Sequence, residues 1–140
     1  MKGGIVQAVV LALVALIPAW IAATFHPDLA HRDRAGLEPD EVRLEEVRAW
    51  TSPILWVDAR GREAYDAGHI PGAVCLDPAQ FDRDLGDILM AWSPEQRVIV
   101  YCSTHTCATS REIAGQLRTA GLEGVHYLRG GWEAWNQALQ

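Results

Sequence analysis

Residues 41–140 are predicted to form an α/β domain in which helices cover both faces of a mainly parallel sheet. Two observations predict this fold class. Short apolar segments rich in β-branched residues alternate with longer segments whose apolar residues recur at helical spacing. Gly and Pro residues separate the two kinds of segment. An alternation of strands and helices is typical of a parallel sheet that is covered on both sides.

Five short segments are predicted to be strands. The segment Arg97–Cys102 contains a continuous run of β-branched residues, and Ile54–Asp58 is apolar up to its last residue. In chain order the predicted strands are Val42–Leu44, Ile54–Asp58, Val74–Leu76, Arg97–Cys102 and Gly124–Leu128.

Five further segments are predicted to be helical. Pro78 suits the first turn of one of them because its fixed backbone angle fits there. In another, Ile113, Ala114 and Leu117 share one face, and Gly121 follows as the C-cap. In chain order the predicted helices are Glu45–Trp50, Arg62–Ala67, Pro78–Met90, Ala108–Ala120 and Trp132–Leu139.

The composition narrows the possible functions. The 140 residues carry a net charge of −6, and Lys2 is the only lysine. This acidic balance argues against nucleic acid as a partner, because binding to phosphates is supported by a basic surface. Three cysteines are too few for a disulfide-bonded scaffold.

The N-terminal segment is predicted to anchor the protein in a membrane. Residues 5–25 are apolar on all sides except at Gln7, and a helix of this length matches the thickness of a bilayer core. Residues 1–27 are therefore assigned to an anchor, residues 28–40 to a juxtamembrane linker, and residues 41–140 to the domain. A cleaved signal segment and a soluble core helix are the alternatives.

The orientation of this single-pass anchor rests on charges at its two ends. Lys2 and the amino terminus favour a cytoplasmic N-terminal side, whereas Arg32 and Arg34 argue for the reverse. We expect the domain on the extracytoplasmic, periplasmic side.

The sequence also indicates where a functional site lies. Ligands of parallel sheets bind at the carboxyl ends of the strands, which places Asp58, Cys102 and Leu128 at one edge. Cys102 ends a strand and is followed by a loop and a helix. Because the first N–H groups of a helix have no backbone acceptor and lie at the positive end of its dipole, they stabilise an anion there. We expect Cys102 to have a lowered pKa and to act as a nucleophilic thiolate.

Further candidate site residues surround Cys102 in the sequence. Asp58, Arg60 and Arg111 are predicted to support the site, and Cys107 is a candidate resolving cysteine. The predicted active-site loop contributes hydroxyls, a histidine and the start of the next helix, through Ser103, Thr104, His105, Thr106, Ala108, Thr109 and Ser110.

Several ordered motifs resemble the rhodanese-like family. They are VDAR at Val57–Arg60, YDAGHIPGA at Tyr65–Ala73, VIVYC at Val98–Cys102 and VHYLRGGWEAW at Val125–Trp135. The resemblance implies a three-layer α/β domain with a five-stranded, mainly parallel sheet. It also implies a cysteine that carries sulfur as a persulfide, and Cys102 matches that position.

The loop departs from the commonest family pattern. Ser110 lies eight positions after Cys102, two more than the family's six, and no Gly or Arg lies between them. The loop lacks the oxyanion-binding Arg of the family's phosphatase relatives, which argues against phosphate-ester hydrolysis. A second cysteine, Cys107, resembles a two-cysteine branch of the family. It would resolve Cys102, form a structural disulfide, or stay reduced.

The predicted function is sulfur transfer by a membrane-anchored, rhodanese-like carrier. The donor would be thiosulfate or a persulfide, and the acceptor a thiol, including that of a partner protein or of Cys107. No metal or organic cofactor is implied. Two alternatives remain open: a non-catalytic module that binds an anion or a partner, and thiol–disulfide exchange through Cys102 and Cys107.

Overall fold

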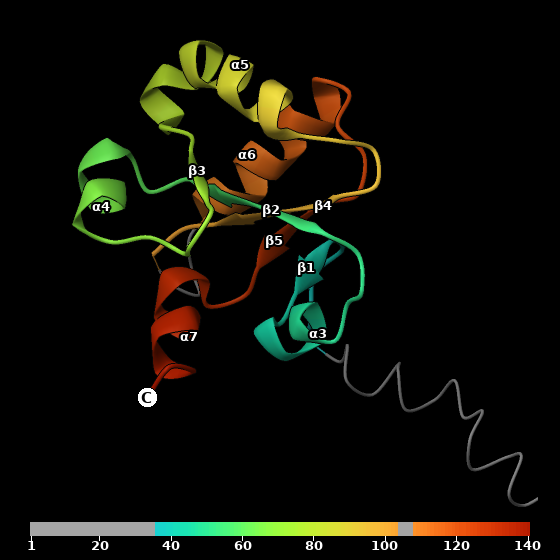
Figure 1. Cartoon of the computed structure of the whole chain (residues 1–140), viewed down its shortest axis with the longest axis vertical. Helices are drawn as coiled ribbons and strands as arrows, with labels where there is room; N and C mark the ends of the chain where they lie inside the picture. Colours follow the sequence, from blue (N-terminus) through green and yellow to red (C-terminus); the bar gives the residue numbers. More distant parts are fainter. Residues whose placement is uncertain (1–35, 104–107) are drawn as a thin grey trace, which may run out of the picture. The chain divides into compact units, whose positions relative to one another are not determined.

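A five-stranded parallel sheet lies at the centre of the computed structural model, which describes residues 36–103 and 108–140. The strands are β1 (Glu41–Val42), β2 (Ile54–Asp58), β3 (Val74–Cys75), β4 (Arg97–Tyr101) and β5 (Val125–Leu128). They lie side by side in the order β1-β5-β4-β2-β3, and each neighbouring pair is parallel (Figure 1). All five predicted strands are present, but Leu44, predicted to end the first of them, lies instead in the helix Leu44–Arg48. Among the described residues the sheet is wholly rather than mainly parallel.

The helices also lie where the sequence predicts them. They are α3 (Leu44–Arg48), α4 (Arg62–Ala67), α5 (Phe81–Ala91), α6 (Ala108–Thr119) and α7 (Gly131–Gln137). One predicted helix is divided, because Gln80 has a φ of −130° between the 3-10 turn Pro78–Gln80 and α5. The carboxylate of Asp77 caps that turn by accepting the N–H of Ala79.

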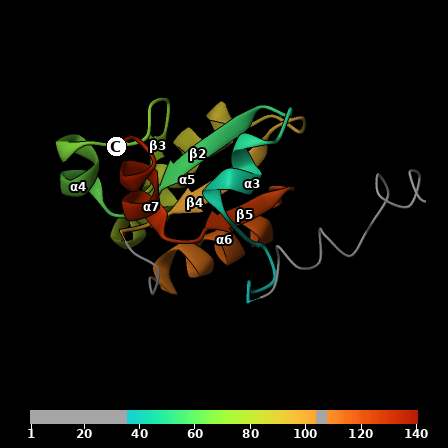
Figure 2. The same ribbon diagram turned by 90° about the horizontal axis from the view of Figure 1, so that it is seen from below.

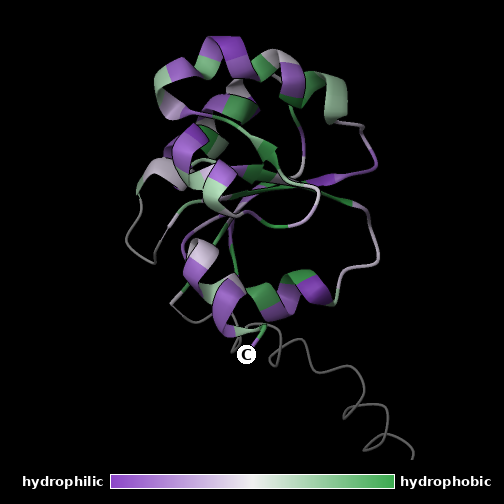
Figure 3. Cartoon of the chain, turned by 60° about the vertical axis from the view of Figure 1, so that its left-hand side comes forward, coloured by the Kyte–Doolittle hydropathy of each residue, from purple (hydrophilic) through white to green (hydrophobic). Residues whose placement is uncertain are grey.

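Two helices cover each face of the sheet, so the domain has three layers. In Figure 1, α5 and α6 lie above the strands, while α3 and α7 lie below. Figure 2 shows α3 and α7 in front of the sheet when the domain is seen from below. The strands are largely hydrophobic, and the helices mix hydrophobic with hydrophilic residues along their length (Figure 3). This pattern fits strands that are buried on both faces.

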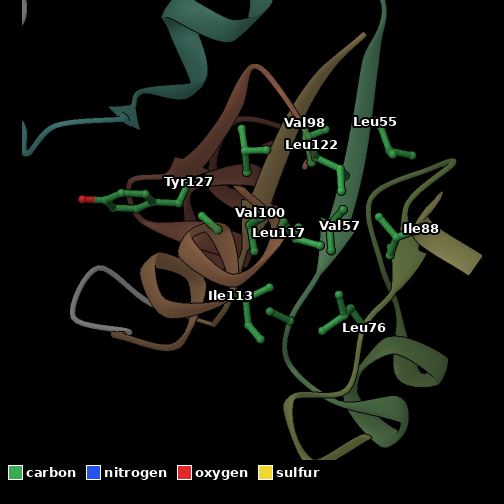
Figure 4. Packing of buried hydrophobic residues seen from close by; sticks show 13 residues of the cluster. Leu55, Val57, Leu76, Ile88, Val98, Val100, Ile113, Leu117, Leu122 and Tyr127 are labelled. Atoms are coloured by element: carbon green, nitrogen blue, oxygen red, sulfur yellow. The ribbon is translucent and has the colours of Figure 1, made fainter. Parts of the chain in front are cut away.

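Strand β4 joins two hydrophobic cores, one on each side of the sheet. Val98 and Val100 pack with the side chains of α5 and α6, among them Ile88 and Leu117 (Figure 4). Because successive side chains of a strand point to opposite faces, Ile99 and Tyr101 pack with α3 and α7 instead. The two cores fix β4, and with it the residue that follows.

The end of α6 confirms the predicted cap. Gly121 has a φ of +98°, a left-handed conformation that glycine adopts without steric cost. Its N–H donates to the carbonyl of Arg118, and the N–H of Leu122 donates to that of Leu117. These two bonds form a Schellman motif that terminates the helix.

Within residues 36–103 and 108–140, no helix is long and apolar enough to cross a membrane. The predicted anchor, residues 5–25, lies outside the described residues, as does the first part of the predicted linker.

Candidate functional site

Cys102 follows directly after β4, and its side chain lies against the first turn of α6. Only 2% of the residue is exposed. Its Sγ lies 3.6 Å from the Oγ of Ser110, a buried residue in the first turn of α6. A hydroxyl at this distance from sulfur is within hydrogen-bonding reach, and the N-terminal end of a helix carries partial positive charge. The predicted placement of Cys102 between a buried strand and a helix N-terminus is therefore confirmed.

The strand register brings the predicted site residues to one edge of the sheet. Asp58 pairs with Tyr101, the residue before Cys102, and Val42 pairs with Leu128. The N–H of Ala59 also donates to the carbonyl of Tyr101. The carboxyl ends of β2, β4 and β5 thus meet at the same edge, as the sequence predicts.

A cluster of Asp58, Arg60 and Tyr101 lies beneath this edge, and we refer to it as the buried cluster. The side chain of Asp58 is fully buried and that of Arg60 is 6% exposed. Arg60 donates from Nε and Nη2 to the two carboxylate oxygens of Asp58, at 2.9 and 2.6 Å. The hydroxyl of Tyr101 donates to Oδ2 of Asp58 at 2.8 Å. Buried charges need such partners, because removal from water is costly.

The environment of the buried cluster changes the protonation equilibria of its members. Burial raises the pKa of the Tyr101 phenol, and the hydrogen bond to Asp58 adds to this effect. Burial opposes the charged form of Arg60, but its hydrogen bonds and the charge of Asp58 outweigh burial and raise the pKa of Arg60. Arg60 therefore remains a guanidinium ion at any physiological pH.

The buried cluster also holds the turn between α4 and β3. The hydroxyl of Tyr101 accepts the N–H of Ile70 at 3.1 Å, and Nη2 of Arg60 donates to the carbonyl of Gly68 at 2.5 Å. In the same turn, the ring of His69 stacks on Tyr65 with a centroid distance of 3.8 Å. Its Nδ1 lies 2.9 Å from the Tyr65 carbonyl oxygen, so His69 has a local role in the turn.

The remaining predicted site residues lie in different places in the structure. Ser103 is exposed, Ala108 and Thr109 begin α6, and Ser110 lies against Cys102. Arg111 does not join the buried cluster; its side chain is 56% exposed and binds the carboxylate of Glu38. Four predicted residues lie outside the described residues, namely Thr104, His105, Thr106 and Cys107.

Three contributors to this edge were not among the predicted site residues. Tyr101 links β4 to Asp58, Trp132 stacks against Arg60, and Gly131 touches the backbone of Cys102. The paired glycines Gly130-Gly131 were the available signal in the sequence, since two successive glycines mark unusual backbone geometry. However, Cys102, the residue that Gly131 contacts, is 29 positions away in the sequence.

Cys75 offers a contrast to Cys102. It ends β3 at the same edge, is 4% exposed and is a free thiol. Burial raises the pKa of the Cys75 thiol, which favours its protonated form. In the described part of the chain, no three His, Cys, Asp or Glu side chains gather in a way that would hold a metal ion.

Comparisons with other proteins agree with this architecture. Residues 43–138 match the rhodanese-like domain. The chain is 31% identical over 85 residues to the thiosulfate sulfurtransferase GlpE of Pseudoalteromonas translucida, covering 61% of this chain and 75% of that protein. It is 30% identical over 112 residues to an HTH-type transcriptional regulator of Mycobacterium tuberculosis. That match covers 79% of this chain, which spans about half (47%) of the length of the regulator.

Solved structures of bacterial proteins share the fold. A Bacillus halodurans protein superposes with a TM-score of 0.61 at 25% identity, covering 81% of this chain and 83% of that one. The rhodanese-like domain of an Anabaena protein gives 0.57 at 25% identity, covering 72% and 76%. A rhodanese-like domain protein from Staphylococcus aureus gives 0.55 at 20% identity, covering 69% and 91%. With the matched region extending over residues 43–138, this chain belongs to the rhodanese-like domain family.

Proposed function

We propose that this protein is a sulfurtransferase that carries sulfur as a persulfide on Cys102. The observation that carries the proposal is the position of Cys102 at the end of β4, with its sulfur 3.6 Å from the hydroxyl of Ser110 at the start of α6. In a rhodanese-like domain, the sulfur-carrying thiolate is expected at this position, between the end of a strand and the start of the next helix. The likeness to a thiosulfate sulfurtransferase supports the same reading.

The first step loads sulfur onto the protein. The Cys102 thiolate attacks the outer sulfur of thiosulfate and forms a sulfur–sulfur bond. The sulfur–sulfur bond of thiosulfate breaks, and sulfite leaves with the electron pair. Cys102 is disulfide-bonded in the structure, so a thiol must first reduce that bond; the exchange with thiosulfate itself then consumes no oxidant or reductant. The Ser110 hydroxyl and the partial positive charge at the start of α6 stabilise the thiolate before the attack and the persulfide anion after it.

The second step returns Cys102 to its starting state. An acceptor thiolate attacks the outer sulfur of the persulfide, the bond to Cys102 breaks, and Cys102 leaves as a thiolate. The acceptor gains the sulfur and becomes the persulfide. A small thiol or a protein thiol fits this role chemically. Cys107, outside the described residues, is the candidate acceptor within the chain.

The buried cluster supports this chemistry by holding the strand ends. Asp58 of β2 binds the side chain of Tyr101, the residue before Cys102, and the N–H of Ala59 binds the Tyr101 carbonyl. Side chain and backbone of Tyr101 are thus both fixed. A nucleophile on such a rigid strand end needs little reorganisation before it reacts.

Steady-state sulfur transfer from thiosulfate to a thiol tests the proposal. We expect Cys102→Ser to reduce the rate to that of the uncatalysed reaction, because serine cannot form a persulfide. Cys75→Ser is the matched control, since this second cysteine lies at the same sheet edge and is also buried. Its activity should remain close to that of the unsubstituted protein.

Other outcomes would favour the alternative functions. Transfer that persists in Cys102→Ser would contradict the proposal. An unsubstituted protein that takes no sulfur, but forms a reversible bond between Cys102 and Cys107, would favour thiol–disulfide exchange. A protein that does neither would favour a binding module.

We further propose that residues 5–25 anchor the domain on the extracytoplasmic side of a membrane. The support is the length and apolar character of this segment. The test is fractionation of the full chain, followed by protease treatment of intact spheroplasts. Membrane-associated protein that is cut from the outside supports the proposal. Recovery in the soluble fraction, or protection of the domain from external protease, would contradict it.

A further inference from the structure

The N-terminal end of α7 binds the backbone of the proposed catalytic cysteine. The N–H of Trp132 donates to the carbonyl of Cys102 at 2.7 Å, and the N–H of Glu133 donates to the carbonyl of Ser103 at 3.2 Å. The first N–H groups of a helix have no acceptor within the helix. In α7, two of these N–H groups are satisfied by the carbonyls of Cys102 and Ser103, the first two residues after β4.

Gly131 makes this contact possible. A Cβ placed on Gly131 would overlap the carbonyl oxygen of Cys102 and lie 2.8 Å from its carbonyl carbon. Gly131 is buried, and its φ of +51° lies in the left-handed region. Neither the space nor the backbone angle suits another residue here, so the close approach of α7 to Cys102 depends on a glycine.

The buried cluster fixes the other side of the same contact. The guanidinium of Arg60 lies 4.4 Å from the ring centroid of Trp132, within the range of a cation–π interaction. The ring of Trp132 also stacks on Tyr101 with a centroid distance of 6.4 Å. The N-terminus of α7 is thus attached to Cys102 through its backbone and to the buried cluster through the Trp132 ring.

The geometry points to Gly131 and the N-terminus of α7 as positioning elements that set the orientation of the Cys102 peptide. They contact no sulfur donor themselves. By holding the carbonyl of Cys102, they fix the direction in which the chain leaves β4, and therefore the place of the sulfur relative to α6. This inference rests on the proposed function of Cys102, but the readout below does not require sulfur transfer.

The test measures the rate at which iodoacetamide alkylates each cysteine of the reduced full chain as a function of pH, with the modified residue identified by mass spectrometry. We expect Gly131→Ala to slow alkylation of Cys102 by about 10- to 100-fold near neutral pH, since small displacements at a reactive centre have effects of that size. Its pH profile should also shift upward, because the sulfur moves away from the start of α6.

Two controls separate positioning from loss of structure. Gly124→Ala places alanine at a similar φ of +63°, but on an exposed residue whose added Cβ makes only ordinary contacts. Its Cys102 profile should match that of the unsubstituted protein. Cys75 is an internal reporter, because a general loosening of the fold would speed alkylation of this buried thiol. In Gly131→Ala we expect the Cys75 rate to be unchanged.

A second variant keeps the inference testable if Gly131→Ala does not fold. Glu133 is exposed, and its N–H donates to the carbonyl of Ser103, which lies outside the helix. Glu133→Pro removes that donor in the first turn, where proline is tolerated, whereas Glu133→Ala keeps it. We expect Glu133→Pro to slow Cys102 alkylation several-fold relative to Glu133→Ala.

Sulfur-transfer kinetics distinguish the two proposals. If the unsubstituted protein transfers sulfur, Gly131→Ala should lower kcat more than it raises KM, because positioning acts on the reacting sulfur. If the unsubstituted protein transfers none, the proposed function fails, while the alkylation profiles still report on positioning. A folded Gly131→Ala whose Cys102 profile equals that of Gly124→Ala would overturn the inference. So would a Glu133→Pro variant that is indistinguishable from Glu133→Ala.

Discussion

Two polar clusters in this domain each combine a carboxylate, an arginine and a tyrosine, but one ion pair is buried and the other is exposed. In the buried cluster, Asp58 binds Arg60 and accepts the hydroxyl of Tyr101, with side-chain exposures of 0% for Asp58 and 6% for Arg60. In a second cluster, which we call the surface cluster, Glu38 binds Arg111 and lies 3.3 Å from the hydroxyl of Tyr127. The side chains of that ion pair are 57% and 56% exposed.

Burial, rather than the type of contact, therefore determines how strongly such a cluster contributes to the stability of the fold. Exposed ion pairs are screened by water and salt and add little to stability. Buried charges depend on each other, because removing one leaves the other without water or a partner. The buried cluster also lies beside Cys102, whereas the surface cluster joins the segment before β1 to the outer side of α6.

The largest expected effect comes from removing one charge of the buried cluster. Asp58→Asn leaves the guanidinium of Arg60 buried without its counter-charge, and we expect a loss of about 3–5 kcal/mol in the free energy of unfolding. Urea unfolding followed by tryptophan fluorescence measures it. The matched variant Glu38→Gln, in the surface cluster, should unfold at nearly the same urea concentration as the unsubstituted protein. Equal losses in the two variants would contradict the comparison.

The two tyrosines allow a smaller and cleaner test. Tyr101→Phe removes a hydroxyl that donates to Asp58 and accepts the buried N–H of Ile70. Because that N–H loses its partner, we expect a cost of about 1–3 kcal/mol. Tyr127→Phe removes one long hydrogen bond to an exposed carboxylate. Its cost should be clearly smaller in the same unfolding measurement; a larger cost than that of Tyr101→Phe would refute the ranking.

The smallest expected effect is a pH dependence of the free energy of unfolding that arises from Glu38 in the surface cluster. The hydrogen bond and the charge of Arg111 lower the pKa of Glu38 below its ordinary value of 4.5. A carboxyl whose pKa is lowered in the folded state stabilises the fold above its unfolded pKa, and this contribution is lost as the pH falls through the folded pKa. We expect the unsubstituted protein to lose slightly more stability than Glu38→Gln below about pH 4.5.

Urea unfolding at a series of pH values and two salt concentrations checks this dependence. The difference between the two proteins should shrink at high salt, because the pair is exposed. A difference that persists in high salt would show that the pair is more shielded than its exposure indicates.

The sequence was sufficient to predict the strands and helices and the sheet edge at which Asp58 and Cys102 lie. The β-branched run of β4 and the apolar run of β2 are local patterns, and parallel strands necessarily align their carboxyl ends. For that reason Cys102 and Asp58 were correctly assigned to one edge. Arg60 follows Asp58 closely in the chain, and in the structure its guanidinium binds the Asp58 carboxylate.

The partners of several residues were beyond what the sequence reveals. Arg111 was predicted to support the site, yet it binds Glu38, which is 73 positions away. The role of Tyr101 depends on the register between β2 and β4, which brings its hydroxyl to Asp58. The sequence does not show what Gly131 contacts, and only the packing of α7 against the end of β4 shows why a side chain has no room there.

The most direct test of the central claim is the intact mass of the full chain, first reduced and then exposed to thiosulfate. Our account predicts a gain of the mass of one sulfur atom, retained in Cys75→Ser, absent in Cys102→Ser and removed by an added thiol. A protein that gains no sulfur, or a Cys102→Ser variant that still gains it, would contradict the assignment of Cys102 as the sulfur carrier.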